Sequence, residues 1–353
     1  MNKRPATVLG IMSGSSLDGL DLAICSFRKH KGKWSFDLLN CKTIPYPEEW
    51  KNRLIQAPDF SGIDLTNLDK EYGKFIGDQA AIFLKDPGIK IDLISSHGHT
   101  VFHQPDAGIT FQIGNGAEIT AITGITSVSD FRRTDMALGG QGAPLVPIGD
   151  ELLFSSYDYC LNLGGFANIS YKKGGHRIAF DICPVNIILN SMMQLNGQQL
   201  DRDGITGRSG QIDIELLEAL NNIAFYQKLP PKSLGTEWLK HEFLPIVKKS
   251  NLSLRNKLRT IYEHIAIQIS RIPIEGKNIL LTGGGTHNLF LVELLHKNCP
   301  GKCIIPEKNI INYKEAIIFA LLGLLRLRGE INCLSSVTGA AKDSCCGAIY
   351  RGV

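Results

Sequence analysis

Long apolar runs are missing from this sequence of 353 residues, and so are low-complexity tracts. No run approaches the roughly 20 apolar residues that a membrane-spanning helix needs. The basic start MNKRPATVLGIMSG has an apolar stretch too short for a signal peptide, and no small-residue cleavage site follows it. These absences argue against membrane insertion and secretion. We therefore expect a cytoplasmic protein without a membrane partner.

A strong excess of charge of one sign is also lacking. The chain has 38 lysines and arginines against 34 aspartates and glutamates, a formal net charge of +4. The basic residues are scattered apart from short clusters such as Lys172-Lys173, whereas nucleic-acid-binding domains carry a basic patch or stripe. We expect no nucleic acid among the partners. The length and a hydrophobic content of 43% predict two globular domains.

Common signatures of metal and nucleotide sites are absent as well. The nine scattered cysteines suit a reducing compartment, and pairs such as Cys299/Cys303 lack further ligands at zinc-binding spacing. Three glycines at 283–285 are not followed by the lysine of a P-loop, and they do not form the Rossmann pattern GxGxxG. A zinc protein, a P-loop kinase and a Rossmann dehydrogenase are all disfavoured.

What the sequence does contain is an alternation of strand and helix patterns, which predicts an α/β fold. The early patterns are, in order, the strands TVLGIM, DLAICSF and WSFDLLNCKTI, the helical stretch 65–84 and the strand DLISSHG. Later helical patterns occupy 186–196, 213–220, 236–247, 253–271 and 313–328, and the last of them places Glu315 in its first turn.

A Gly/Pro-rich segment at 138–149 divides these patterns into two halves. After it, YCLNLGGFANISYKK repeats the strand, glycine turn and strand of residues 7–27. Two similar domains are therefore predicted. The first covers residues 1–145, completed by 335–353 if the chain end returns to it, and the second covers residues 146–334.

Polar glycine turns follow three of the predicted strands, at Gly14, Gly164-Gly165 and 283–285. The first lies in GIMSGSSLDGLDLA, whose hydroxyls and unhindered backbone N–H groups are suited to a phosphate cradle. Asp18 and Asp21 of this stretch suit a metal ion or the cap of the next element. A flexible tip or close packing would explain one such turn, but three together favour a nucleotide.

A carboxylate also stands at the end of the strand HRIAFDI, at Asp181. Ligands of α/β sheets bind outside the carboxyl ends of the strands, so this position favours a functional role over a turn or cap aspartate. Asn186, which follows Pro184, is the better candidate for the N-cap of the next helix.

Histidines and an arginine offer groups for a polar substrate. In SSHGHTVFHQP, the spacing of His97 and His99 suits hydrogen bonding better than a zinc site, and a structural role is the alternative for His103. In SDFRRTDMALGGQGAPL, the planar donor fork of Arg132 suits an anionic group, whereas Arg133 fits a surface ion pair.

Taken together, the motifs resemble the blocks of the anhydro-N-acetylmuramic acid kinase family from residue 10 to about 349. They are GIMSGSSLDGLDLA, SSHGHTVFHQP, TFQIGNGAEIT, DFRRTDMALGGQGAPLVP, LNLGGFANIS, AFDICPVN, RDGITGRSG, PPKSLGTEWL, LTGGGTHN and EAIIFALLG. The resemblance implies the acetate-and-sugar-kinase/Hsp70/actin fold, in which two related ribonuclease H-like domains form the active-site cleft. It also implies a homodimer.

The resemblance further implies an activity. Such a kinase cleaves the 1,6-anhydro ring of 1,6-anhydro-N-acetylmuramic acid with water and phosphorylates O6, giving N-acetylmuramic acid 6-phosphate and ADP in peptidoglycan recycling. It implies ATP and Mg²⁺ as cofactors, Asp181 as the catalytic base, and Asp18 as a metal ligand. The implied substrate-binding residues are His97, Arg132 and Glu315. The implied ATP-binding residues are Ser13, Gly14, Ser15, Ser16, Leu17, Asp18, Gly19, Asp21, Gly164, Gly165, Asn168, Gly283, Gly284, Gly285 and Asn288.

The sequence departs from the family pattern beside Asp181. There Ile182, Cys183 and Val185 replace the threonine and both glycines of Asp-Thr-Gly-Pro-Gly-Asn. Less backbone freedom and less room for sugar are expected. Two alternatives therefore stay open, a nucleotide-dependent sugar-binding sensor without turnover and a kinase for another amino sugar. Smaller departures are Ser15 for threonine, His99 for glutamine and Asn190 for aspartate.

Overall fold

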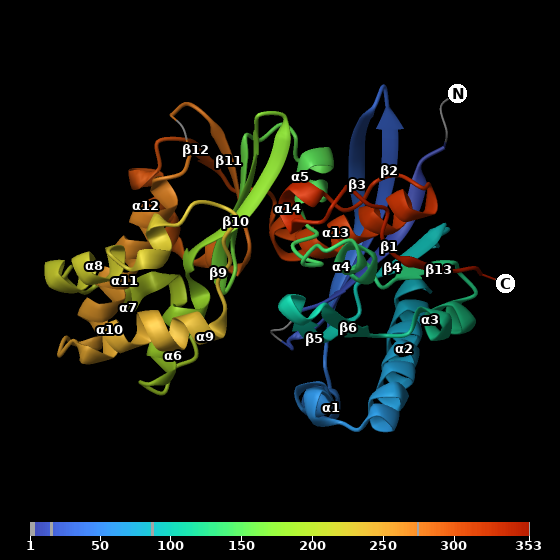
Figure 1. Cartoon of the computed structure of the whole chain (residues 1–353), viewed down its shortest axis with the longest axis horizontal. Coiled ribbons are helices and arrows are strands. Elements are labelled where there is room, and N and C mark those ends of the chain that lie inside the picture. The colour runs from blue at the N-terminus through green and yellow to red at the C-terminus, as the bar shows by residue number, and fades with distance from the viewer. Residues whose placement is uncertain (1–3, 15–16, 86–87, 274, 353) are drawn as a thin grey trace. The chain divides into compact units, whose positions relative to one another are not determined.

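The chain forms two compact α/β units, as the sequence predicts. The computed structural model describes residues 4–14, 17–85, 88–273 and 275–352. Unit 1 comprises residues 1–153 and 313–353, and unit 2 comprises residues 154–312. Figure 1 labels most of the helices and strands of both units. Within the described part of the chain, no helix has the length and apolar character that crossing a membrane requires.

Unit 1 is built on a six-stranded sheet in the order β13-β7-β4-β1-β2-β3. Its strands are β1 (Ala6–Ser13), β2 (Gly19–His30), β3 (Lys33–Pro45), β4 (Leu93–Ser96), β7 (Ser127–Ser129) and β13 (Ala348–Tyr350), and a separate ribbon joins β5 (His99–Gln104) to β6 (Ile109–Ile113). Its helices are α1 (Glu48–Gln56), α2 (Gly62–Leu84), α3 (Gly116–Thr123), α4 (Arg133–Ala137), α5 (Pro147–Leu153), α14 (Ser335–Thr338) and, from residue 313, α13 (Lys308–Leu327).

Unit 2 is built on a five-stranded sheet in the order β10-β9-β8-β11-β12. Its strands are β8 (Tyr159–Leu163), β9 (Phe166–Lys173), β10 (His176–Pro184), β11 (Asn278–Thr282) and β12 (Lys302–Ile304). Its helices are α6 (Asn186–Gln194), α7 (Ile205–Arg208), α8 (Ile214–Asn221), α9 (Thr236–Trp238), α10 (Leu244–Lys249), α11 (Leu254–Ser270) and α12 (Leu289–Asn298).

The two sheets share one plan, which confirms the predicted pair of related domains. In each sheet three antiparallel strands come first in the chain, and two parallel strands follow on the far side of the first one. In unit 1, β13 adds an antiparallel strand beside β7. The repeated hairpin of the sequence is therefore β1-β2 in unit 1 and β8-β9 in unit 2. Because β1 and β8 each pair in parallel with a later strand, their polar turns lie at the edge where ligands bind in α/β sheets.

Alternating side chains explain why β1 and β2 belong to a sheet that is buried on both faces. In β1, Leu9 and Ile11 point into the unit 1 core together with Leu20 and Leu22 of β2. Gly10 lies on the opposite face, where a Cβ atom would overlap the carbonyl oxygen of Ala316 in α13. The period of two thus gives one face to the core and the other to a helix that packs at backbone distance.

Helix α13 differs from its predicted place in two ways. From the sequence, residues 146–153 and 313–334 are expected in the second domain, whereas both stretches belong to unit 1. There Lys314 forms a buried ion pair with Asp150, and Ser95 donates to the Phe319 carbonyl oxygen. An apolar helix pattern carries no information about which sheet it covers. The helix also begins at Lys308, so Glu315 lies in its third turn rather than its first.

We predict that Gly10→Ala destabilises unit 1 by about 1–3 kcal/mol, because the new methyl group would push β1 and α13 apart. Urea denaturation followed by fluorescence measures the change. Gly62→Ala is the matched control, since this glycine opens α2 with no atom within 4 Å of an added Cβ atom. Equal unfolding midpoints for the two variants would contradict the assigned packing.

Candidate active site

A row of polar side chains crosses the unit 2 sheet on the face turned away from its apolar core. Asp181 in β10 pairs with Asn168 in β9, Asn168 pairs with Asn162 in β8, and Asn162 pairs with Thr282 in β11. The neighbours of this row along each strand, such as Phe180 and Leu161, are core residues. Directly paired residues of a sheet share a face. The row therefore leads from the predicted base to the glycines that follow Thr282.

Asp181 is held by the segment 232–234, which lies within the block PPKSLGTEWL and has no role assigned from the sequence. The Asp181 N–H donates to the Lys232 carbonyl oxygen at 3.1 Å, and the Leu234 N–H donates to Asp181 Oδ2 at 2.8 Å. Burial raises the pKa of the Asp181 carboxyl group, while the hydrogen bond from Leu234 partly offsets this rise. A carboxylate that is oriented and more basic than usual suits a general base.

The side chains beside Asp181 do not occupy the face on which its carboxylate lies. Ile182 is 3% exposed, Cys183 and Val185 are fully buried, and all three belong to the unit 2 core. A β-bulge between Asp181 and Cys183 turns the side chains of Ile182 and Cys183 toward the core. The expected loss of room for sugar is therefore wrong for these side chains. Burial also raises the pKa of the Cys183 thiol, which keeps it protonated and unreactive.

Asn186 has a different role from the predicted N-cap. It is the first residue of α6, and its Nδ2 donates to the Leu163 carbonyl oxygen at 3.1 Å. The backbone N–H groups of Val185 and Ile187 donate to the Gly165 carbonyl oxygen. The glycine turn after β8 thus satisfies N–H groups that a helix start leaves without partners, and a side-chain cap is not needed.

The glycines of unit 2 divide into those that packing requires and those that it does not. Gly283 has a φ of +86°, and an added Cβ atom there would lie 2.5 Å from Asn162 Oδ1; at Gly285 it would lie 2.8 Å from Leu163 Cβ. At Gly165 and Gly284 the nearest atom would be 3.8 Å away, and neither has a positive φ. Packing within the described chain therefore does not require glycine at positions 165 and 284. A glycine without such a requirement is expected where the backbone approaches a ligand.

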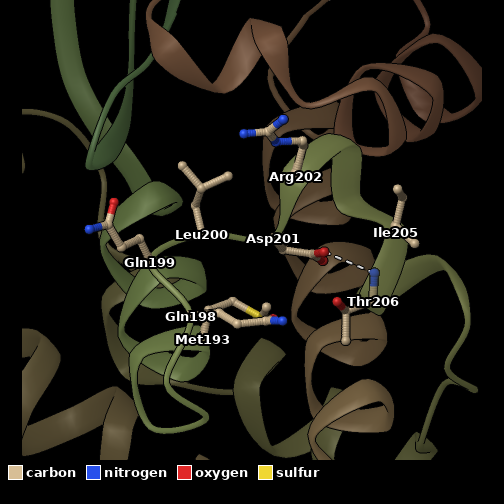
Figure 2. A pocket seen from close by; sticks show the side chains of 8 residues that line it. All are labelled: Met193, Gln198, Gln199, Leu200, Asp201, Arg202, Ile205 and Thr206. Carbon is tan, nitrogen blue, oxygen red and sulfur yellow. Dashed lines mark hydrogen bonds between the residues drawn. The ribbon is translucent and has the colours of Figure 1, made fainter.

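A pocket of about 410 Å³ lies in unit 2 beside the start of α12, and the sequence analysis did not identify it. Figure 2 shows its lining, with Asp201 bonded to the Thr206 N–H. Asn288 caps α12 through its Oδ1, and its Nδ2 donates to Tyr262 and reaches the Asp201 carbonyl oxygen. The lining residues are Met193, Gln198, Gln199, Leu200, Asp201, Arg202, Ile205 and Thr206.

In unit 1, His97 and Arg132 form one hydrogen-bonded unit. Nε and Nη2 of Arg132 lie 3.3 and 2.9 Å from His97 Nε2, and His97 Nδ1 lies 2.9 Å from the Gly98 carbonyl oxygen. Burial and the neighbouring guanidinium lower the pKa of His97 to about 3, so the ring is neutral, with Nδ1 as donor and Nε2 as acceptor. Burial lowers the pKa of Arg132 to about 10, which leaves it charged at neutral pH.

Asp135 fixes the loop that holds the other side of Arg132. Nη1 of Arg132 donates to the Gly142 carbonyl oxygen at 3.0 Å, and the Gly142 N–H donates to Asp135 Oδ2 at 2.8 Å. Asp135 is fully buried and also accepts from the Thr338 hydroxyl and the Cys333 thiol. The guanidinium is therefore locked in one orientation, with two of its five N–H groups left for another acceptor.

Carboxylates gather near the first hairpin of unit 1. Asp21 accepts from the Thr43 hydroxyl at 2.6 Å, and its pKa is raised by burial and by Asp18. The pKa of Glu315 is raised by desolvation and by Asp21, against the opposing charges of Lys314 and Arg132. Within the part of the chain that the structure describes, no group of three His, Cys, Asp or Glu residues is placed to hold a metal ion. Mg²⁺ commonly uses only one or two carboxylates together with water and phosphate oxygens, which Asp18 and Asp21 fit.

The turn of the first hairpin is only partly defined. Gly14, Leu17 and Asp18 are described, whereas the predicted nucleotide residues Ser15 and Ser16 lie outside the described residues. The Ser13 hydroxyl accepts from Tyr46 at 2.8 Å and lies 3.0 Å from His99 Nδ1. Ser13 is 3% exposed, so its hydroxyl serves this internal network.

Comparison with known proteins identifies the family. The sequence matches the family model described as anhydro-N-acetylmuramic acid kinase over residues 6–352. The chain belongs to this family. It is 32% identical to the anhydro-N-acetylmuramic acid kinase of Gloeobacter violaceus, over 98% of this chain and 99% of the relative. It is 33% identical to that of Sulfurimonas denitrificans, over 97% and 99%, and 34% identical to that of Xanthomonas oryzae pv. oryzae, over 97% and 96%.

Membership of the anhydro-N-acetylmuramic acid kinase family confirms the predicted sugar kinase and disfavours the sensor. The departures after Asp181 that favour the sensor are side chains of the unit 2 core. Two elements were missed from the sequence, the segment 232–234 that holds Asp181 and the pocket at 193–206. The block PPKSLGTEWL points to the segment 232–234. Its contact with Asp181 cannot be predicted from that block, because backbone hydrogen bonds between distant segments leave no pattern in residue types.

We predict that Gly165→Ala weakens ATP binding at least tenfold, measured by calorimetry, with a melting temperature within about 2 °C of the parent, because only a ligand needs this space. Gly283→Ala is the comparison. Its positive φ and the contact with Asn162 predict a clear loss of stability, of about 1–3 kcal/mol. Unchanged ATP affinity in a folded Gly165→Ala variant would contradict the assignment.

Proposed function

We propose that this kinase hydrolyses the 1,6-anhydro ring of 1,6-anhydro-N-acetylmuramic acid and transfers the γ-phosphoryl group of ATP to O6. The products are N-acetylmuramic acid 6-phosphate and ADP, and the role is the recycling of peptidoglycan fragments. The observation that carries the proposal is Asp181, an oriented carboxylate with a raised pKa. It lies in a polar row that leads to glycine turns in which Gly165 and Gly284 are sterically unhindered. The proposed location is the cytoplasm, and the proposed assembly is a homodimer.

In this reaction Asp181 takes a proton from the water that attacks the anomeric carbon. The bond between that carbon and O6 breaks as the bond to the water oxygen forms, and O6 then accepts the phosphoryl group. Asp181 Oδ2 is engaged by the Leu234 N–H, which leaves Oδ1 to accept from the water. Burial raises the pKa of Asp181, which makes its carboxylate a stronger base than that of an exposed aspartate.

Nucleotide binding is proposed for the glycine turns and the pocket of unit 2. The unhindered backbone of Gly165 and Gly284 would face phosphates, and the pocket beside Asn288 would take the adenosine end. Helix α6 runs from Asn186, at the turns, to Met193, in the pocket lining, about 10 Å further along its axis. This separation is similar to the length of a triphosphate chain. Asp18 and Asp21 would hold Mg²⁺, which neutralises phosphate charge when bound.

Sugar binding is proposed for the locked guanidinium of Arg132. Its two remaining N–H groups form a planar fork that suits the carboxylate of the lactyl group, the only anionic group of the sugar. The neutral His97 orients the fork without adding charge of its own. Glu315 would accept hydrogen bonds from the sugar, since it lies within electrostatic range of Arg132.

We expect mass spectrometry of a reaction in ¹⁸O-labelled water to show a phosphorylated sugar with one labelled oxygen at the anomeric carbon. Attack by water on that carbon places solvent oxygen there, whereas phosphorylation of an already opened sugar would not require it. A phosphorylated product that still holds the anhydro ring, or a product labelled only in phosphate, would contradict coupled ring hydrolysis.

Asp181→Asn should reduce kcat by at least about a thousandfold, because the amide cannot accept the proton of water, and should leave ATP affinity within about twofold. Steady-state kinetics and calorimetry measure the two effects. Asp37→Asn, at an exposed carboxylate of β3, is the matched control and should behave as the parent. An Asp181→Asn variant with parental turnover would remove the proposed base.

A further inference from the structure

The segment 232–234 is attached to the rest of unit 2 through the side chain of Lys232. We propose that Lys232 is a positioning residue for the reaction, because it anchors the segment whose Leu234 N–H orients the Asp181 carboxylate. This inference rests on the proposed function of Asp181 as the base. Lys232 itself is not proposed to touch the substrate.

The anchor is an ammonium group among aromatic rings. Lys232 Nζ lies 4.7 Å from the ring centroid of Phe225 and 5.8 Å from that of Phe180, and it donates to the Phe225 carbonyl oxygen at 3.4 Å. Phe225 is 5% exposed and packs against Trp238 at 5.3 Å between ring centroids. A cation over the face of a buried aromatic ring is held by attraction to the ring and by packing of its methylene groups. Lys232 therefore joins the segment to a rigid part of the core.

The same three residues contact Asp181 from both ends. The carbonyl oxygen of Lys232 accepts from the Asp181 N–H, and two residues later the Leu234 N–H donates to Oδ2. Backbone and side chain of Asp181 are thus bound to one short stretch. Lys232 holds its first residue, and Leu234 packs against the unit 2 core at its other end. The donor to the carboxylate is a backbone N–H, which does not depend on the residue type. The side chain of Lys232 is therefore the part of this arrangement that mutation can test.

Two titratable groups near Asp181 are uncharged, whereas the Lys232 ammonium lies over the ring of Phe180, the neighbour of Asp181. The Cys183 thiol on the same strand and the Tyr226 hydroxyl, from the turn before the segment, both have pKa values raised by burial and are neutral at physiological pH. The facing residue of β9 is Asn168, which carries no charge. Among the influences on the pKa of Asp181, burial is the largest and the Leu234 hydrogen bond opposes it.

The direction of the expected change in the pKa of Asp181 follows from the balance between burial and the Leu234 hydrogen bond. The Leu234 N–H stabilises the charged carboxylate and so lowers the pKa of Asp181. A segment that has lost its anchor would make this bond more weakly, and the pKa of Asp181 would rise further above its ordinary value. Since the base must be ionised, the acid limb of kcat/KM would move to higher pH.

The test compares Lys232→Met with Lys232→Arg in the full chain. Lys232→Met keeps the length and apolar character of the side chain but removes the charge, and we expect the acid limb to rise by roughly half to one pH unit. We expect kcat at neutral pH to fall about tenfold with KM for ATP unchanged. Lys232→Arg retains a cation over the ring and should restore both within about twofold. Lys228→Met, at an exposed lysine four residues earlier, removes the same charge and should behave as the parent.

Titration of Asp181 by ¹³C-carboxyl NMR, assigned with Asp181→Asn, gives a readout independent of turnover. Phe225→Leu, which removes the ring but keeps the ammonium, should raise the pKa of Asp181 in the same direction as Lys232→Met. An unshifted Asp181 titration in Lys232→Met, or an equal shift in Lys228→Met, would overturn the proposal. If Asp181→Asn retains turnover, the proposed function fails, while the titration still decides whether Lys232 positions the carboxylate.

Discussion

The register of the unit 2 sheet is the constraint on which the rest of the site depends. Asp181, Asn168, Asn162 and Thr282 share one face only because each is paired directly with the next. A slip of one residue in any of these pairings would turn the polar side chains into the core and expose their apolar neighbours. The hydrophobic effect that buries Leu161, Ile169 and Phe180 thus also arranges the polar row. Core formation and site assembly are the same event in this unit.

The Asp181 carboxylate of unit 2 and the Arg132 guanidinium of unit 1 are held in different electrostatic environments. In unit 2 a single backbone donor orients Asp181, and burial keeps it more basic than an exposed aspartate. In unit 1 the cation of Arg132 is fixed by neutral acceptors, a histidine nitrogen and a carbonyl oxygen, and the carboxyl group of Glu315 acts on it electrostatically. A base needs a raised pKa and one free oxygen, whereas an anion-binding fork needs free N–H groups in a fixed orientation. Each arrangement satisfies its own requirement.

Steric detail separates residues that resemble one another in sequence. Gly283 is required by a positive φ and by the approach of Asn162, while Gly284 beside it has open space. Ile182, Cys183 and Val185 depart from the family pattern but lie within the core, so they alter packing rather than the face that carries Asp181. The chain belongs to the anhydro-N-acetylmuramic acid kinase family with these larger side chains in its core.

The α/β class, the repeated hairpin and the family can be recognised from the residues alone, because strand alternation, glycine turns and ordered motifs are local properties of residue types. The place of Asp181 at a strand end is local information of the same kind. The folded chain is needed to show that α13 covers the unit 1 sheet, that Asn186 binds Leu163 instead of capping its helix, and that the segment 232–234 holds the carboxylate. Those features depend on contacts between segments far apart in the chain, and such contacts are set by packing and backbone hydrogen bonds that many sequences satisfy equally well.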